Sequence, residues 1–280
     1  MSNYILVLGA TGKTGKRVAD RLLKMNLPVR IGSRNANPKF DWEDPATWSN
    51  ILKDVAKVYI TYQPDLAVPG AVEVIQSFVT KAVNSGVRKI VLLSGRGEKE
   101  AQLCEEIVMS SGADWTIVRA SWFSQNFSES FLLDSILAGH VALPTRGVSE
   151  PFVDVEDIAD VVTAALTNND HTRKLYELTG PRLLTFEQAV TEISKAANLP
   201  VQYQEISIEA YTAMLREYNT PKEFIWLLEY LFTEVLDGRN VSLCDGVEQA
   251  LGRKPIDFSD YTKRTAATGT WTSPKFMGVD

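Results

Sequence analysis

Short apolar runs alternate with longer amphipathic stretches over about the first 180 residues of the chain. The runs are rich in Val, Ile and Leu without polar alternation, which is typical of strands buried on both faces of a parallel sheet. The pattern predicts strands at Tyr4–Leu8, Val29–Gly32, Phe40–Trp42, Val55–Ile60, Val87–Leu93, Trp115–Val118 and Lys174–Gly180. The stretches between them repeat apolar residues at helical spacing. This alternation predicts an α/β protein with a Rossmann-type, doubly wound parallel sheet.

After Pro181 the pattern becomes mostly helical. Thr185 and Gln188 have the spacing of a capping box, which predicts a helix from there to about Ala197. A small strand at Val201–Ile206 is expected next, followed by helices at Ile208–Tyr218, at Lys222–Leu236 and from Asp257 onward. We expect residues 1–125 and 150–180 to form the nucleotide-binding domain. Residues 126–149 and 181–280 would then form a smaller, mostly helical region that binds substrate.

A glycine-rich turn, Gly9-Ala-Thr-Gly12-Lys-Thr-Gly15, follows the first predicted strand and leads into the first predicted helix. In this context Gly9 allows a sharp turn, Gly12 lets a pyrophosphate approach the backbone, and Gly15 lets the helix lie close to the strand. The helix N-terminus offers free N–H groups and a positive dipole end to the phosphates. The turn therefore predicts a dinucleotide site.

The end of the second predicted strand decides between the two nicotinamide cofactors. An acidic residue there would bind the ribose 2′-hydroxyl of NAD, whereas an arginine accommodates the 2′-phosphate of NADP. The chain has Ser33-Arg34 at this point and no acid before Asp41. We therefore expect the cofactor to be NADP(H). The alternative interpretation of Arg34 is a surface arginine without a role in cofactor binding.

Composition narrows the class of protein. The chain has 45% hydrophobic and 23% charged residues, a net charge of −6 and a pI near 5.2. An acidic chain is a poor match for nucleic acid, whose phosphates need a basic face. No signal peptide precedes the first strand and no apolar stretch has the length of a membrane span, so we expect a cytoplasmic protein with a small-molecule substrate and no membrane partner. With Cys104, Cys244 and two histidines in no ligand-like spacing, no metal site is expected.

Several motifs resemble a known family. The G-x-x-G-x-x-G spacing is similar to that of extended and atypical short-chain dehydrogenases/reductases. Further segments resemble the NmrA-like members of that superfamily: Trp115-Thr-Ile-Val-Arg119, Phe152-Val-Asp-Val-Glu-Asp-Ile-Ala-Asp160 and Tyr176-Glu-Leu-Thr-Gly-Pro181. Phe40–Trp48 and Ala266–Trp271 resemble a narrower branch that includes festuclavine synthase and agroclavine dehydrogenase.

The resemblance implies an NADP(H) molecule lying in an extended pose. Its adenosine end would lie near Ser33, Arg34 and Asp41, and its pyrophosphate over the turn residues Gly9, Thr11, Gly12, Lys13, Thr14 and Gly15. The nicotinamide would lie near Tyr62, Gln63, Ser94, Gly95, Ser121, Trp122 and Phe123. Catalytic roles would fall to Ser94, Tyr62 and Trp122, under a cover formed by the C-terminal segment.

One departure from the superfamily bears on the reaction. Carbonyl-reducing members use a serine together with a Tyr-x-x-x-Lys pair. Ser94 stands at the serine position, but no tyrosine lies between Tyr62 and Tyr176. Without a phenol to protonate an alkoxide, simple ketone reduction is disfavoured. Hydride transfer to an electron-poor iminium, quinone or enone remains, and so does a non-catalytic NADP(H)-binding redox sensor.

Other residues have plainer interpretations beside the functional ones. Ser94 could simply end a strand, and Tyr62 suits a core as well as a site. The aromatic residues at 224, 226, 230 and 232 are expected to pack between helices. Glu98 and Lys99 are interpreted as a solvated helix start, and Cys104 as a core residue.

Overall fold

The computed structural model describes residues 4–272, and two compact units can be distinguished within them. The first comprises Met1–Ala120, Val155–Leu178 and Asp245–Arg253, and the second Ser121–Asp154, Thr179–Cys244 and Lys254–Asp280, as far as these ranges are described. The units differ from the expected domains in that residues 121–125, 150–154 and 179–180 join the second, and 245–253 the first. Met1-Ser-Asn3, the residues before the first strand on which the expectation of no signal peptide rests, lie outside the described residues.

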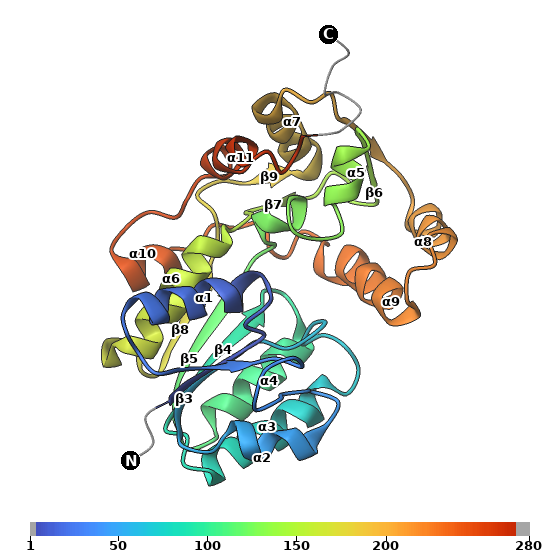
Figure 1. The fold of residues 1–280 in the computed structure, drawn as a ribbon. Coiled ribbons are helices and arrows are strands. Elements are labelled where there is room, and N and C mark those ends of the chain that lie inside the picture. The colour runs from blue at the N-terminus through green and yellow to red at the C-terminus, as the bar shows by residue number, and fades with distance from the viewer. Residues whose placement is uncertain (1–3, 273–280) are drawn as a thin grey trace. The chain divides into compact units, whose positions relative to one another are not determined.

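The first unit is built on a six-stranded parallel sheet, which confirms the predicted fold class (Figure 1). Its order is β2-β1-β3-β4-β5-β8. The strands are β1 (Tyr4–Leu8), β2 (Val29–Gly32), β3 (Val55–Ile60), β4 (Lys89–Gly95), β5 (Asp114–Ala120) and β8 (Lys174–Leu178). β2 and β3 lie on opposite sides of β1, so the chain crosses from one half of the sheet to the other between them. Open α/β sheets bind ligands at such a crossing point.

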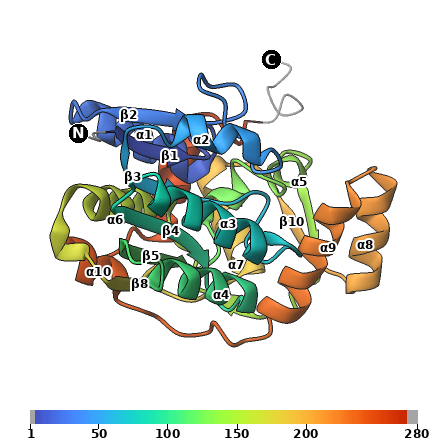
Figure 2. The ribbon, with the colours of Figure 1, turned by 90° about the horizontal axis from the view of Figure 1, so that it is seen from below.

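Helices cover both faces of this sheet (Figures 1 and 2). One face carries α1 (Lys13–Lys24) and α6 (Val155–Thr167), and the other α3 (Ala71–Asn84) and α4 (Lys99–Met109). Shorter elements complete the unit: η1 (Pro45–Thr47), α2 (Trp48–Ile51), η3 (Asn169–His171) and α10 (Gly246–Leu251). Arg21 of α1 binds Glu156 and Asp160 of α6, each at 2.7 Å, which fixes the two helices against each other.

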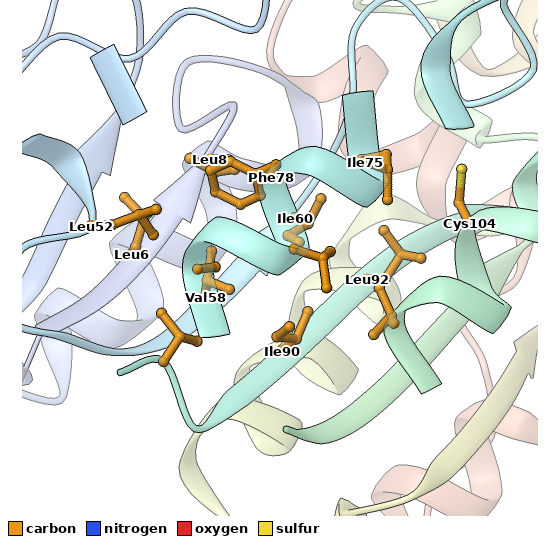
Figure 3. Packing of buried hydrophobic residues seen from close by; sticks show 14 of the residues in the cluster. Leu6, Leu8, Leu52, Val58, Ile60, Ile75, Phe78, Ile90, Leu92 and Cys104 are labelled. Atoms are coloured by element: carbon orange, nitrogen blue, oxygen red, sulfur yellow. The ribbon is translucent and has the colours of Figure 1, made fainter. Parts of the chain in front are cut away.

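Buried aliphatic side chains join the sheet to α3 and α4 (Figure 3). Leu6, Val58, Ile90 and other residues of the same strand face contact Ile75, Phe78 and Cys104 of the helices. Alternate residues of a strand point to the same face, so the continuous apolar runs of the sequence supply this core and also the opposite one. The core holds the carboxyl ends of β1, β3 and β4 in fixed register.

The predicted strand at Phe40–Trp42 is wrong, because this segment is a loop. Its backbone N–H groups are satisfied locally: Phe40 donates to the Ser33 carbonyl and Asp41 to the Thr47 hydroxyl. The aromatic rings instead form a cluster, with Trp42 lying 4.8 Å from Phe40 and 5.1 Å from Phe78 between ring centroids. The apolar residues that suggested a strand therefore anchor a loop.

The second unit combines short strands and helices; the sequence predicted its helical character and the strand β10, but not β6, β7 or β9. Parallel β6 (His140–Leu143) and β10 (Gln202–Glu205) form one pair, and antiparallel β7 (Ser149–Glu150) and β9 (Leu184–Thr185) another. Its helical elements are η2 (Ser124–Phe127), α5 (Leu133–Leu137), α7 (Phe186–Ala197), α8 (Ile208–Glu217), α9 (Lys222–Tyr230), η4 (Leu231–Val235) and α11 (Phe258–Ala267). The capping box of Thr185 and Gln188 is confirmed at the start of α7.

The helix predicted at Lys222–Leu236 changes its winding part-way. The first part, α9, is an α-helix, and the second part, η4, is a π-helical turn. Arg146 donates to the carbonyls of Phe232 and Leu236 at 3.1 and 2.7 Å, and so binds oxygens at the end of this turn. Within the described residues, no helix combines the length and the apolar character that a membrane span needs.

Candidate functional site

The glycine turn after β1 forms the N-terminus of α1. Gly12 is the N-cap residue, with no side chain bonded to the helix end, and no acidic residue lies in the first helical turn. The Gly12 N–H donates to the Gly9 carbonyl at 2.8 Å, which closes the turn. The first N–H groups of a helix have no partner within it, and Gly12 has no side chain that could cap them. This end of α1 is therefore suited to an anion.

Two of the three glycines are required by close contacts. Gly9 has φ of +59°, and a Cβ there would lie 2.6 Å from the Thr61 methyl group. A Cβ on Gly15 would lie 2.3 Å from the Gly9 carbonyl oxygen, so the helix does pack tightly on the turn, as expected. Gly12 differs, because a Cβ there would meet only the Gly9 oxygen, at 3.3 Å. The outer side of Gly12 is therefore open, as a pyrophosphate site requires.

The other turn residues divide into two kinds. Thr11 is exposed and Lys13 half-buried, so both are accessible to a ligand. Thr14 is buried, and its hydroxyl accepts a hydrogen bond from Tyr59 of β3 at 2.9 Å. Burial raises the pKa of the Tyr59 phenol, which stays protonated and keeps this bond. Thr14 thus ties α1 to the sheet, and its predicted cofactor contact stays a prediction.

At the end of β2, charged side chains gather around Asp41. Lys39 lies 3.2 Å from the Asp41 carboxylate. The Asp41 pKa is lowered despite partial desolvation, by the Glu43 N–H, by Lys39 and by the positive charge of Arg34. The loop after Ser33 therefore brings Lys39 against the Asp41 carboxylate and Arg34 close enough for its charge to act on it. Sequence reasoning missed Lys39, although its place two residues before Asp41 was an available sign.

The residues after β3 and β4 lie in different surroundings. Tyr62 is half-buried, with its ring 5.0 Å from that of Trp42, and Gln63 is exposed. Ser94 is only 4% exposed, and its hydroxyl donates to Glu105 of α4 at 2.6 Å. The single hydroxyl proton of Ser94 is thus already engaged, which leaves its oxygen lone pairs for a ligand.

Glu105 is the centre of a buried charged network that sequence reasoning did not find. Arg119 of β5 binds Glu105 through two guanidinium nitrogens and Glu177 of β8 through a third. Arg96 lies 3.4 Å from Glu177 as well. The carboxylates hold the pKa of Arg119 above its ordinary value. The network joins the ends of β4, β5 and β8 and orients Ser94.

The remaining predicted residues belong to the second unit. The Ser121 hydroxyl is buried and has no hydrogen-bond partner in the part of the chain that the structure describes. Trp122 is half-buried, with its ring 5.3 Å from both Phe186 and Phe232. Phe123 begins η2 and bridges to Val153. Of the aromatic residues expected in helix packing, Phe232 is buried, whereas Trp226 is 40% exposed and stacks on Tyr230.

Cys104 lies in the core, as predicted, and its reactivity can be tested. Burial, reinforced by the nearby carboxylates of Glu105 and Glu100, raises the pKa of its thiol to about 12. Cys244 is partly exposed. Since the thiolate is the reactive form, we expect an aromatic disulfide reagent to titrate one thiol in the native protein and both in denaturant. Fast reaction of Cys104 in the Cys244→Ser variant would contradict this assignment.

Comparison with known proteins places the chain in a family. The model of the NmrA-like family matches residues 1–262. The chain belongs to the NmrA-like family. This match confirms the resemblance drawn from the motifs. Separately, a search of the described residues finds no group of three or more His, Cys, Asp or Glu side chains that could hold a metal ion.

Individual relatives and a solved structure match almost the full length. Agroclavine dehydrogenase of Claviceps fusiformis is 29% identical, over 92% of this chain and 95% of its own. The NAD(P)H azoreductase of Xenophilus azovorans is 26% identical, over 94% of this chain and 98% of its own. The NADPH complex of the Escherichia coli quinone oxidoreductase QOR2 superposes with a TM-score of 0.78 at 20% identity, covering 93% of this chain and 99% of that one.

Proposed function

We propose that this NmrA-like protein is an NADPH-dependent reductase that passes hydride to an electron-poor acceptor such as an iminium ion, a quinone or an enone. The observation that carries the proposal is the N-terminus of α1, which is uncapped, free of acidic residues in its first turn and open above Gly12. Such an end binds a phosphate group through backbone N–H groups and the helix dipole. The relatives named as a dehydrogenase and an azoreductase support a redox role.

The cofactor is NADP(H), and this chain's residues bind it along the carboxyl edge of the sheet. Arg34 and Lys39, with Ser33 as a further donor, bind the 2′-phosphate beside Asp41. The turn from Gly9 to Lys13 binds the pyrophosphate, and the ends of β3 and β4 orient the nicotinamide. NADPH supplies the hydride, while the protein supplies position and charge.

The acceptor class follows from what the chain lacks. No tyrosine lies between Tyr62 and Tyr176, so no Tyr-x-x-x-Lys pair follows Ser94 to protonate the alkoxide formed from a ketone. Tyr218 and Lys222 have this spacing, but Tyr218 is an exposed residue of the second unit. An iminium ion needs hydride alone, whereas a quinone or an enone gives a delocalised, weakly basic anion that a group other than a Tyr–Lys pair can protonate. Tyr62, whose ring lies 5.0 Å from that of Trp42, offers an apolar face at the end of β3, and aromatic faces attract a cationic acceptor.

The function is tested by mixing purified protein and NADPH with iminium, quinone and enone acceptors and following NADPH absorbance. We expect turnover with at least one acceptor class and none with simple ketones. Binding of NADPH without turnover of any acceptor would contradict a reductase and favour the redox sensor.

Arg34→Ala tests the assignment of the cofactor. Removing one of two cations beside the 2′-phosphate is expected to weaken NADPH binding about tenfold to 100-fold, or about 1.4–2.7 kcal/mol. NADH binding should change less than about threefold, because NADH has no charged group at that position. Titration calorimetry with both cofactors measures the ratio. Lys24→Ala, which removes an exposed cation at the far end of α1, is the control. An equal loss for both cofactors would contradict the assignment.

A further inference from the structure

Glu98 has an unusual position for a residue at the start of a helix. It is the N-cap of α4, with φ of −98° and ψ of 122°, yet its side chain makes no capping bond. It is 6% exposed, and a Cβ on Gly95 would lie 2.1 Å from its Oε1 and 2.2 Å from its Oε2. The carboxyl group thus folds back over the last residue of β4, in space that only a glycine leaves free. The expectation of a solvated Glu98 is wrong, whereas Lys99 is exposed.

A second carboxyl group lies against Glu98. Asp65, in the loop after β3, accepts a hydrogen bond from the Ala67 N–H at 2.9 Å, and its side chain shares a hydrogen bond with Glu98. Oε2 of Glu98 is buried and has no hydrogen-bond partner in the described part of the chain. One carboxyl can donate to another only when it is protonated. The pair therefore contains a shared proton and an oxygen that is free to bind something else.

The surroundings favour the protonated form of Glu98. Burial, together with repulsion from Asp65, Glu100 and Glu105, raises the pKa of Glu98 well above its ordinary value. Burial also raises the pKa of Asp65, and the negative charges reach Cys104 too, whose thiol stays neutral. A buried carboxylate without a cation beside it is costly, so the group retains its proton instead.

The pair lies at the edge of the sheet where the cofactor is proposed to bind. Asp65 follows β3 and Glu98 follows β4, the two strands next to β1 on the side away from β2. The β4 end is two strands from the glycine turn, or about 10 Å. Adenosine is assigned to the β2 side, so the nicotinamide extends over β3 and β4. Ser94 and Gly95, which are predicted to contact it, adjoin the Glu98 carboxyl in the fold and the sequence.

We propose that Glu98, which shares a proton with Asp65, is the acid that protonates acceptors whose reduction requires a proton. The assignment rests on the hydride transfer proposed above. The acceptor takes a hydride from NADPH at carbon, and the displaced electron pair moves to its carbonyl oxygen. That oxygen forms an O–H bond as the Glu98 O–H bond breaks, which leaves NADP⁺ and a Glu98 carboxylate. Asp65 is half-buried, so it returns a proton from solvent to Glu98.

Glu98→Gln separates this role from a purely structural one. Glutamine keeps the shape and can donate a hydrogen bond to Asp65, but it transfers no proton. We expect single-turnover reduction of a para-benzoquinone at saturating NADPH to fall about 10²- to 10⁴-fold. Reduction of an N-methylated cyclic iminium salt, which needs hydride alone, should change less than about twofold. The control is Glu106→Gln, which alters an exposed carboxylate on the same helix.

A second measurement does not depend on activity. The folded state of the wild type holds the Glu98 proton more tightly than the unfolded chain. Unfolding therefore releases a proton between the two pKa values, and stability falls as pH rises through that range. As pH rises above the ordinary glutamate pKa of 4.5, we expect the wild type to lose free energy of unfolding relative to Glu98→Gln.

The outcomes distinguish the two proposals. If the wild type reduces neither acceptor, the reductase proposal fails and the donor role with it. If the wild type is active and Glu98→Gln slows both acceptors equally, or neither, only the donor role is overturned. A constant stability difference across the pH range would show that Glu98 does not retain its proton, which also overturns the role.

Discussion

Gly15→Ala is expected to destabilise the protein by about 2–3 kcal/mol and to abolish measurable NADPH binding. The added methyl group would lie 2.3 Å from the Gly9 oxygen, 2.6 Å from the Gly9 carbonyl carbon and 2.9 Å from the Ala10 nitrogen. All three are backbone atoms of the turn itself, so no side chain can move aside. Relief requires α1 to move away from β1, which also displaces the N–H groups assigned to the pyrophosphate.

Gly12→Ala is the matched comparison within the same turn. Its Cβ would meet one atom at 3.3 Å, and its backbone has φ of −89° and ψ of 179°, which alanine adopts without strain. We expect the free energy of unfolding to change by less than about 1 kcal/mol, while NADPH binds about 100-fold more weakly, or about 2.7 kcal/mol.

Urea denaturation and NADPH titration of both variants make the comparison. Gly15 is needed for the packing of α1 on the turn, and Gly12 for the approach of the pyrophosphate to the backbone. We therefore expect Gly15→Ala to lose both stability and NADPH affinity, and Gly12→Ala to lose NADPH affinity alone. Full NADPH affinity in Gly12→Ala would mean that the pyrophosphate does not approach the turn, and native stability in Gly15→Ala would mean that the turn is looser than described.

The sequence predicted the sheet well because a doubly wound fold is specified locally. Each buried strand is a continuous apolar run, and each helix repeats apolar residues at its own period, so β1, β3 and α1 could be recognised without tertiary information. The glycine turn could be recognised for the same reason. Phe40–Trp42 was mistaken for a strand because rings that anchor a loop and residues that fill a strand have the same local pattern.

The charged part of the site could not be predicted in this way. Arg119 meets Glu177 only because β5 and β8 are neighbours, and Glu98 meets Asp65 only because β3 and β4 are neighbours. Contacts between segments far apart in sequence leave no periodic signal. The sequence held one indirect indication of the Glu98 position. Glu98 stands three residues after a strand that ends in Gly95, and the missing side chain of that glycine leaves room for the Glu98 carboxyl to fold back.

Arg119→Met is expected to destabilise the protein by about 3–5 kcal/mol, because it removes the one cation that, within residues 4–272, forms an ion pair with the Glu105 carboxylate, which is 1% exposed. Methionine fills much of the arginine stem, so a cavity contributes little. The loss comes from the Glu105 charge, which retains only the hydrogen bond from Ser94 at 2.6 Å. Arg88→Met, at an exposed arginine one residue before β4, should change stability by less than about 0.5 kcal/mol.

The double variant Glu105→Gln/Arg119→Met tests the cause of this loss. If the penalty is the uncompensated buried charge, neutralising Glu105 should restore about 1–3 kcal/mol, measured by urea denaturation as a double-mutant cycle. The glutamine still accepts the Ser94 hydrogen bond, so the end of β4 keeps its conformation beside Gly95. Additive losses in the double variant would show that Arg119 acts through packing alone. A positive coupling energy would show that the network carries a charge at the strand ends, which is the condition for Ser94 and Glu98 to be held where the nicotinamide is proposed to bind.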